Sequence, residues 1–198
     1  MTYDTFIALG IFALVTSVSP GPSNFMLLAS GVNFGFVRTI PQIAGITLGF
    51  TSLLLAVGLE LGALLAAYPP LSALLKVGGG GYLLWLAWRI GTSGSMSSGA
   101  SAAARPLTIF ESALFQWINP KAWVVAVSAM AIYLDENAPV RSASWVSAAF
   151  AMVNLPSVAV WAAFGVTLRQ YLLKPGRLKR FNVCMGILLA ATLWPMLT

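Results

Sequence analysis

Ser19-Pro20-Gly21-Pro22 interrupts the apolar run Phe6–Leu28, and Asn119-Pro120-Lys121 interrupts the apolar run Ser112–Leu134, one hundred residues later. A proline inside a helix removes a backbone hydrogen bond and clashes with the preceding turn. Within a membrane, such a break is tolerated where protein or a water-filled cavity satisfies the freed carbonyl groups. Interrupted hydrophobic segments at corresponding places in two halves of a chain point to the binding site of a transporter. The two breaks therefore predict both the architecture and the place of the site.

The composition is that of an integral membrane protein. Hydrophobic residues make up 59% of the 198 residues and charged residues only 8%, whereas a soluble domain has about 25% charged residues. So few charges could not cover the surface of a soluble globule of this length. The first apolar segment has no basic region before it and is longer than the core of a cleaved signal peptide, so we expect it to remain in the mature protein.

The polar composition excludes several classes of site. The chain has no histidine, one cysteine and five carboxylates, which excludes an intramolecular disulfide, a Cys/His metal site and a histidine-based catalytic triad. We therefore expect no metal site, no cofactor and no enzyme activity. The eleven Lys and Arg outnumber the five Asp and Glu. In a membrane protein this excess of basic residues indicates loops that face the cytoplasm and contact anionic lipid headgroups, rather than a nucleic-acid partner.

Six apolar segments are long enough to cross a bilayer, which takes about 20 residues. They are Thr5–Val32, Ile40–Ala67, Leu71–Ile90, Ile109–Leu134, Ser144–Leu168 and Phe181–Leu197. Residues 92–106 are rich in Ser, Gly and Ala, which is typical of a flexible linker. The linker separates residues 1–91 from residues 107–198, with three segments on each side. Because three is odd, the second half must enter the membrane in the opposite sense. The predicted fold is an all-α integral membrane protein with six transmembrane helices in a 3+3 inverted repeat, its first and fourth helices broken by proline.

The basic residues predict the orientation in the membrane. Eight of the eleven fall at the loops that join segments one and two, three and four, and five and six: Arg38, Arg89, Arg105, Arg169, Lys174, Arg177, Lys179 and Arg180. The opposite face carries Asp4, Asp135, Glu136 and Arg141. By the positive-inside rule, the basic loops and the linker are cytoplasmic, and both termini lie outside.

Each break also resembles a helix start, since Ser19 or Asn119 suits an N-cap and the following proline suits the first helical position. Two half-helices would then begin near the membrane midplane. Their positive N-termini and unpaired N–H groups would converge on one point. Lys121 adds a full charge roughly 18 Å into its segment, and a centre of this kind suits a carboxylate. The alternative is that the prolines only bend the helices for packing and that Lys121 snorkels to an interface.

Two further groups of polar residues lie in apolar segments. Glu60 and Lys76 flank the turn Tyr68–Pro70 and are expected at similar depths on adjacent helices. They could form an ion pair, or Glu60 could accept the proton that couples transport. Asn154 and Pro156 predict a third break, in which Asn154 lines a cavity or bonds a neighbouring helix.

Small residues recur at helical spacing in the second and third segments. Gly45-x-x-x-Gly49 and Gly58-x-x-x-Gly62 lie in the second, and Gly78–Gly81 lies in the third. This spacing permits close approach of two helices, so we expect these glycines to serve packing.

Four motifs together resemble the lysine exporter / homoserine–threonine resistance family of bacterial amino-acid exporters, and most of all its cysteine/O-acetylserine exporters. They are Pro20-Gly21-Pro22 with Asn24, Ala44–Gly49, Gly81–Trp88 and Asn119–Ala122, and the match runs through the whole chain in order. The resemblance implies a bacterial inner-membrane carrier that exports amino acids or their derivatives, driven by the proton gradient, with a homodimer as one assembly. Ser23 stands where many members of the family have Asn or Asp, which leaves the substrate open.

The leading hypothesis is a secondary transporter, an antiporter that exports a small zwitterionic solute through the lipid bilayer. The predicted substrate-binding residues are Ser19, Pro20, Gly21, Pro22, Asn24, Asn119, Pro120, Lys121 and Asn154, with Glu60 as the candidate for coupling. A passive channel would instead show flux without proton coupling. An intramembrane hydrolase would need Ser19 and Lys121 as nucleophile and base.

Overall fold

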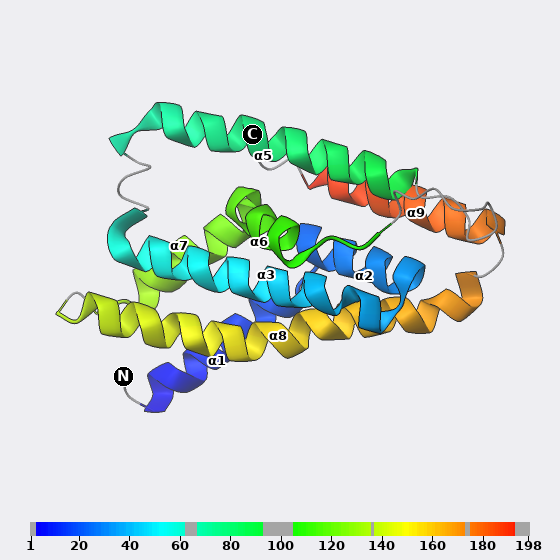
Figure 1. The fold of residues 1–198 in the computed structure, drawn as a ribbon. Helices are drawn as coiled ribbons and strands as arrows, with labels where there is room; N and C mark the ends of the chain where they lie inside the picture. The colour runs from blue at the N-terminus through cyan, green and yellow to red at the C-terminus, as the bar shows by residue number, and fades with distance from the viewer. Residues whose placement is uncertain (1–2, 62–66, 93–104, 136, 173–174, 193–198) are drawn as a thin grey trace.

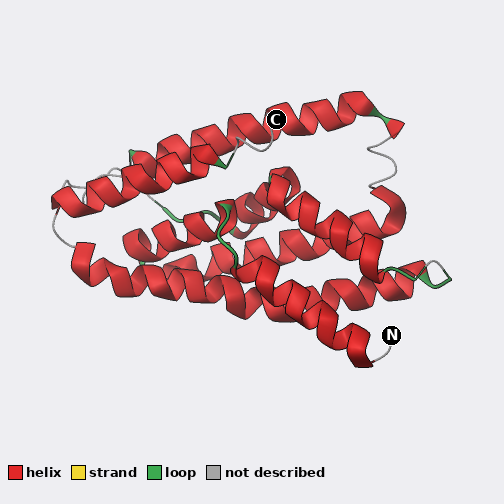
Figure 2. Cartoon of the chain, turned by 180° about the vertical axis from the view of Figure 1, so that it is seen from behind, coloured by secondary structure: helices red, strands yellow, loops and turns green. Residues whose placement is uncertain are grey.

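The computed structural model describes residues 3–61, 67–92, 105–135, 137–172 and 175–192. Throughout these residues the regular structure is helical (Figure 2). The elements are α1 (Tyr3–Val18), α2 (Pro22–Phe34), α3 (Phe36–Ala56), the π-helical turn η1 (Val57–Leu61), α5 (Pro69–Gly91), α6 (Ile109–Ile118), α7 (Pro120–Tyr133), α8 (Pro139–Leu172) and α9 (Pro175–Ala191). A helix coincides with each of the six predicted apolar segments, which confirms an all-α protein. Most of the predicted linker lies outside the described residues.

Two helices in the described part of the chain are long and apolar enough to cross a membrane. They are Phe36–Glu60, with 25 residues, and α8, with 34 residues. The pair α1 and α2 meets the same requirements as a third, bent span, with an angle of 57° at the break. The first proline break is therefore a sharp change of direction in a span-length segment.

The first break differs in detail from its prediction. α2 begins at Pro22 and its N-cap is Gly21, so the prediction that Ser19 is the N-cap and Pro20 the first helical residue is wrong. A residue before proline is restricted to extended backbone, and Gly21 has φ −177° and ψ 176°. With two prolines two residues apart, the helix begins only at the second one. At the other break Asn119 is the N-cap of α7 and Pro120 its first residue, as predicted.

The predicted third break is absent, because α8 continues through Asn154 and Pro156. A single proline removes one backbone donor, and a membrane helix tolerates this when local groups compensate. The first break, in contrast, has two prolines around an extended glycine.

Glycines bring four helices together in two close pairs. A methyl group at Gly31 of α2 would overlap the carbonyl of Ala162 in α8, and one at Gly165 of α8 would overlap the carbonyl of Leu28 in α2. In the same way, Gly45 and Gly49 of α3 lie against the backbone of α6. The prediction of close packing at Gly45 and Gly49 is confirmed, and each pair joins a helix of the first half to one of the second. α5 and α9 lie side by side along one edge of the molecule (Figure 1).

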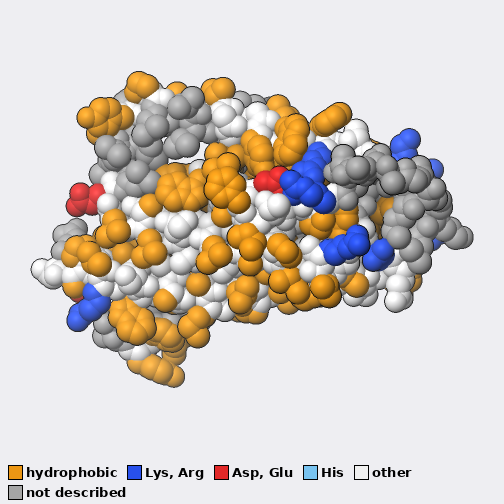
Figure 3. Space-filling view, viewed as in Figure 1, with side chains coloured by type: hydrophobic (Ala, Val, Ile, Leu, Met, Phe, Trp, Pro, Cys, Tyr) orange, Lys and Arg blue, Asp and Glu red, His pale blue; other side chains and the backbone are white. Residues whose placement is uncertain are grey.

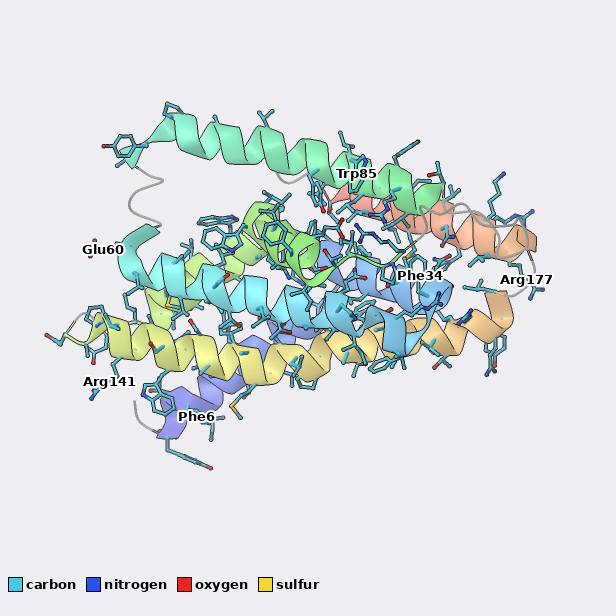
Figure 4. All side chains as sticks on the ribbon, viewed as in Figure 1. Phe6, Phe34, Glu60, Trp85, Arg141 and Arg177 are labelled. Atoms are coloured by element: carbon cyan, nitrogen blue, oxygen red, sulfur yellow. The ribbon has the colours of Figure 1, made fainter. Side chains whose placement is uncertain are left out.

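The two ends of the molecule differ in charge. The space-filling view shows blue side chains toward one end (Figure 3), where the start of α3 and the end of α8 meet and a side chain at Gly35 would lie 3.3 Å from Arg169. We call this the basic end, and its residues are Arg38, Arg169, Arg177, Lys179 and Arg180. Figure 4 shows Glu60 and Arg141 at the opposite end.

Candidate functional site

The two breaks meet at a cavity of about 40 Å³ in the middle of the helix bundle. Polar residues of both halves line it: Thr16, Ser17, Ser23 and Asn24 from the first half, and Gln116, Asn119, Lys121 and Asn154 from the second. Apolar side chains, among them Phe50 and Val158, complete the wall. The structure thus brings together segments that are a hundred residues apart in the sequence.

Lys121, the second residue of α7, reaches across the cavity to the first break. Its Nζ donates to the Ser19 carbonyl at 2.6 Å, to the Ser19 hydroxyl at 2.8 Å and to the Pro20 carbonyl at 3.4 Å. Among the described residues, the one ion pair is formed by Arg105 and Glu111, at the start of α6. The ammonium group of Lys121 therefore meets neutral oxygen atoms and no described carboxylate, which leaves its charge available to an anion.

Gly21 makes room for this lysine. A Cβ atom at Gly21 would lie 2.7 Å from Cδ of Lys121 and 3.1 Å from its Nζ. Any residue can adopt the extended backbone found there, so glycine is required by the space and not by the conformation. The Pro-Gly-Pro stretch thus turns the chain and also admits the lysine.

Asn119 holds the second break against the first. Its Oδ1 accepts from the backbone N–H of Lys121 at 3.2 Å, which caps α7. Its Nδ2 donates to Gln116 Oε1 at 2.9 Å and to Ser23 Oγ at 3.1 Å. The Ser23 hydroxyl donates in turn to Gln116 Oε1 at 3.0 Å. These three buried side chains form a closed triangle across the two halves.

Two further asparagines bond to the end of α1 beside the first break. Asn24 Nδ2 donates to the carbonyls of Ser17 at 3.0 Å and Ser19 at 2.8 Å, and no described donor reaches its Oδ1. Asn154 Nδ2 donates to Ser17 Oγ at 3.2 Å, and its Oδ1 accepts from Thr47 at 3.3 Å. Asn154 therefore both lines the cavity and bonds neighbouring helices, so each of the two predicted roles is present.

The site brings groups of opposite polarity next to one another. The end of α1 presents the carbonyl groups of Ser17, Ser19 and Pro20, where a helix carries its negative dipole end. The start of α2 has no side-chain cap, so it presents a positive dipole end close to Lys121. A site of this kind can bind a carboxylate and an ammonium group together.

The remaining predicted site residues lie around or away from this centre. Pro20, Pro22 and Pro120 set the backbone of the breaks, and only the carbonyl of Pro20 contacts Lys121. Glu60 is exposed at the end of the α3–η1 segment, where its φ is 74°. It does not line the cavity. The side chain of Lys76 lies outside the described residues, and so does the predicted ion pair with Glu60.

Gln116, Ser17 and Thr47 were not predicted from the sequence, and Ser23 was not predicted as a site residue. Gln116 had a signal that could have found it. It lies three residues before Asn119, so the helical period puts both side chains on the same face of an otherwise apolar segment. The two hydroxyl residues had no comparable signal.

Comparison with known proteins identifies the family of this chain. The family model described as LysE type translocator matches residues 14–192, which include both breaks. This chain belongs to the LysE type translocator family. The resemblance seen in the sequence motifs is thereby confirmed.

Several curated relatives of this LysE-family chain carry the name cysteine/O-acetylserine efflux protein. Those of Escherichia coli K12, Shigella sonnei Ss046 and Shigella flexneri are each 30% identical to it over 193 residues. The alignments cover 96% of this chain and 95% of each relative. No solved structure matches this LysE-family protein.

Proposed function

We propose that this protein is a secondary transporter that exports small amino acids or their derivatives across the bacterial inner membrane. The observation that carries this proposal is the charge of Lys121, which no described carboxylate pairs, beside the carbonyl groups of Ser19 and Pro20 at the junction of the two breaks. Membership in a translocator family and the efflux function named in its relatives support the same conclusion.

The solute binds through both of its charged groups. Its carboxylate binds the Lys121 ammonium and the uncapped start of α2. This contact replaces the bonds that Lys121 now makes to Ser19. Its ammonium group donates hydrogen bonds to the carbonyls at the end of α1 and to Oδ1 of Asn24. The cavity of about 40 Å³ holds only a few water molecules, which need about 10–15 Å³ each, so binding requires the helices to rearrange.

This need for rearrangement favours a carrier over a passive channel. On the side of the cavity away from the basic end, Phe12, Phe50 and Phe150 pack edge to face, with ring centroids 6.0 Å and 5.6 Å apart. A channel would need a continuous opening through this apolar cluster.

The contact between Ser19 and Lys121 does not favour a hydrolase. The lysine nitrogen donates to three oxygen atoms, and the Ser19 hydroxyl donates to the Thr16 carbonyl at 2.9 Å. A general base must accept the proton of the nucleophile, and here the lysine is the donor.

The proposed transporter has a 3+3 inverted repeat, residues 1–91 and 107–198. The helix order supports it, since the broken segment α1–α2 corresponds to α6–α7, α3 to α8 and α5 to α9. The basic end faces the cytoplasm and both termini lie outside, as the positive-inside rule requires. Protons drive export, with Glu60 as the coupling carboxylate, and two copies of the chain form the assembly.

The test is uptake and efflux of a panel of amino acids by purified protein in proteoliposomes, with and without an imposed pH gradient. We expect efflux of a small zwitterion, such as cysteine or O-acetylserine, that accelerates when the gradient is present. Flux that follows only the solute gradient would establish a passive pathway, and absence of flux for every amino acid would refute the proposal.

A further inference from the structure

Three buried side-chain atoms have no hydrogen-bond partner among the described residues: Gln42 Oε1, Ser112 Oγ and Ser147 Oγ. The exposed fractions of these residues are 2%, 0% and 1%. A buried polar atom without a partner is costly, so each such atom in a native structure needs a reason. One reason is a second conformation in which water or a ligand supplies the partner.

Gln42 and Ser112 adjoin the cavity on the side of the basic end. Gln42 lies one helical turn before the cavity residue Ile46, toward the start of α3, and Ser112 lies one turn before Gln116 in α6, against Gly45. They belong to a set of buried polar residues that follows α2 from the cavity toward the basic end. We call this set the polar seam, and its members are Ser23 and Ser30 of α2, Thr39 and Gln42 of α3, and Ser112 and Gln116 of α6.

The polar seam lies between two closely packed helix pairs. Glycines bring the backbones of α2 and α8 into contact, and other glycines do the same for α3 and α6. Across the seam, α2 meets α3 through side chains: the hydroxyls of Ser30 and Thr39 bond at 2.9 Å, and Leu27 packs in one apolar cluster with Ile43 and Ile46. α2 is joined to α6 by the bond from Ser23 to Gln116. Side-chain bonds of this kind exchange readily with water, so the seam is the natural place for the pairs to separate.

α2 is also free to change direction at both of its ends. The break at residues 19–21 bends the chain by 57° before α2. Gly35 follows α2 with φ 82° and ψ 170°, a conformation that is open to glycine and strained for other residues. With a hinge at each end, α2 can tilt about its close contact with α8 while the segments before and after it keep their places.

We propose that the polar seam is the cytoplasmic access path of the exported solute, closed in this structure, and that Gln42 and Ser112 contact the solute and water when α2 moves away from α3 and α6. This inference rests on the proposed export function and adds the route by which a zwitterion reaches Lys121. The seam has no charged residue, which suits a solute whose own charges cancel.

The first test is the reactivity of single cysteines. Cys184 is exposed, so the background is Cys184→Ser, and the probes are Gln42→Cys and Ser112→Cys. The matched control is Leu53→Cys, because Leu53 is buried in the same helix as Gln42 but packs in a cluster of buried apolar residues that includes none of α2 or α6. A membrane-impermeant thiol reagent is added to inside-out and to right-side-out vesicles.

We expect the thiols introduced by Gln42→Cys and Ser112→Cys to react about tenfold faster than the control from the cytoplasmic side, and to be protected by the transported amino acid. Reaction no faster than that of the control would overturn the inference, and so would reaction only from the outer side. Ser112→Cys replaces one atom, so this variant keeps the fold if Gln42→Cys does not.

The second test is Gln42→Leu, which removes the unpaired atom and keeps the side-chain volume. We expect a higher melting temperature, because the closed seam loses its unpaired group, and export about tenfold slower, because the open seam loses its polar contact. A merely structural glutamine would change stability alone, so normal export by this variant contradicts the inference. If the unmodified protein transports no amino acid, the proposed function itself has failed, and that result is separate from these.

Discussion

Nζ of Lys121 lies 2.6 Å from the carbonyl oxygen of Ser19, a residue 102 positions earlier in the chain. The lysine of the second break thus completes the first one, since it donates to carbonyl groups that the end of α1 leaves without helical partners. Without the second break, these carbonyl groups of the first break would lack the hydrogen bonds that Lys121 donates.

Replacing Lys121 with alanine should abolish export while the protein still inserts. The proposed partner of this charge is the carboxylate of the solute, and truncating one partner of a buried, hydrogen-bonded charge pair costs about 2–5 kcal/mol, so we expect flux in proteoliposomes to fall by about two orders of magnitude. Lys179→Ala is the matched control, because Lys179 is exposed at the basic end. Near-normal flux in Lys121→Ala would remove this residue from the site.

Gly21→Ala should impair export and spare the fold. The new Cβ would lie 2.7 Å from Lys121 Cδ, and the flexible lysine can move away, so we expect normal yield and roughly tenfold lower flux from the displaced ammonium group. Gly31→Ala is the contrasting variant. Its Cβ would overlap the backbone of Ala162, so this variant should lose folded protein, by about 1–3 kcal/mol of overpacking. Equal yields and equal fluxes for the two variants would contradict the assignment of Gly21.

Gln116→Leu should destabilise the protein. Its Oε1 accepts from both Ser23 and Asn119, and loss of the acceptor leaves two buried donors without it, at a cost of about 1–3 kcal/mol each. We expect a clearly lower melting temperature in detergent. Leu114→Val, at a half-exposed position of the same helix, controls for general effects on α6. An unchanged melting temperature would mean that the triangle contributes nothing to stability.

Glu60→Gln tests the coupling role directly. Glu60 is exposed and does not line the cavity, so we expect substrate affinity to stay normal while flux loses its dependence on the pH gradient. Affinity follows from competition with a labelled solute, and coupling from flux at several imposed gradients. Full coupling in this variant would exclude Glu60 as the proton acceptor, and a loss of protein yield alone would favour the ion pair with Lys76.

The helices and the breaks could be predicted from the sequence because they depend on local properties. Apolar length predicted the helices, and the Asn119 cap with Pro120 at the first helical position predicted the start of α7. The errors at Ser19 and Pro156 arose where the outcome depends on neighbouring residues. A second proline moved the start of α2, and a single proline was absorbed by α8.

The contacts of the site depend on how the helices are rotated against one another, and periodicity does not define that rotation. Lys121 was found because a charge in an apolar segment is conspicuous. Gln42 and Ser112 were not, since their significance lies in the bonds that they lack in the folded protein.

The contact between Ser19 and Lys121 also has a consequence for genetics. Damaging alleles of this site should fall in two clusters about a hundred codons apart, although the residues concerned touch in the folded protein. A mutation that suppresses a defect in the Pro-Gly-Pro stretch of the first break should then be sought around codon 121, in the other half of the gene.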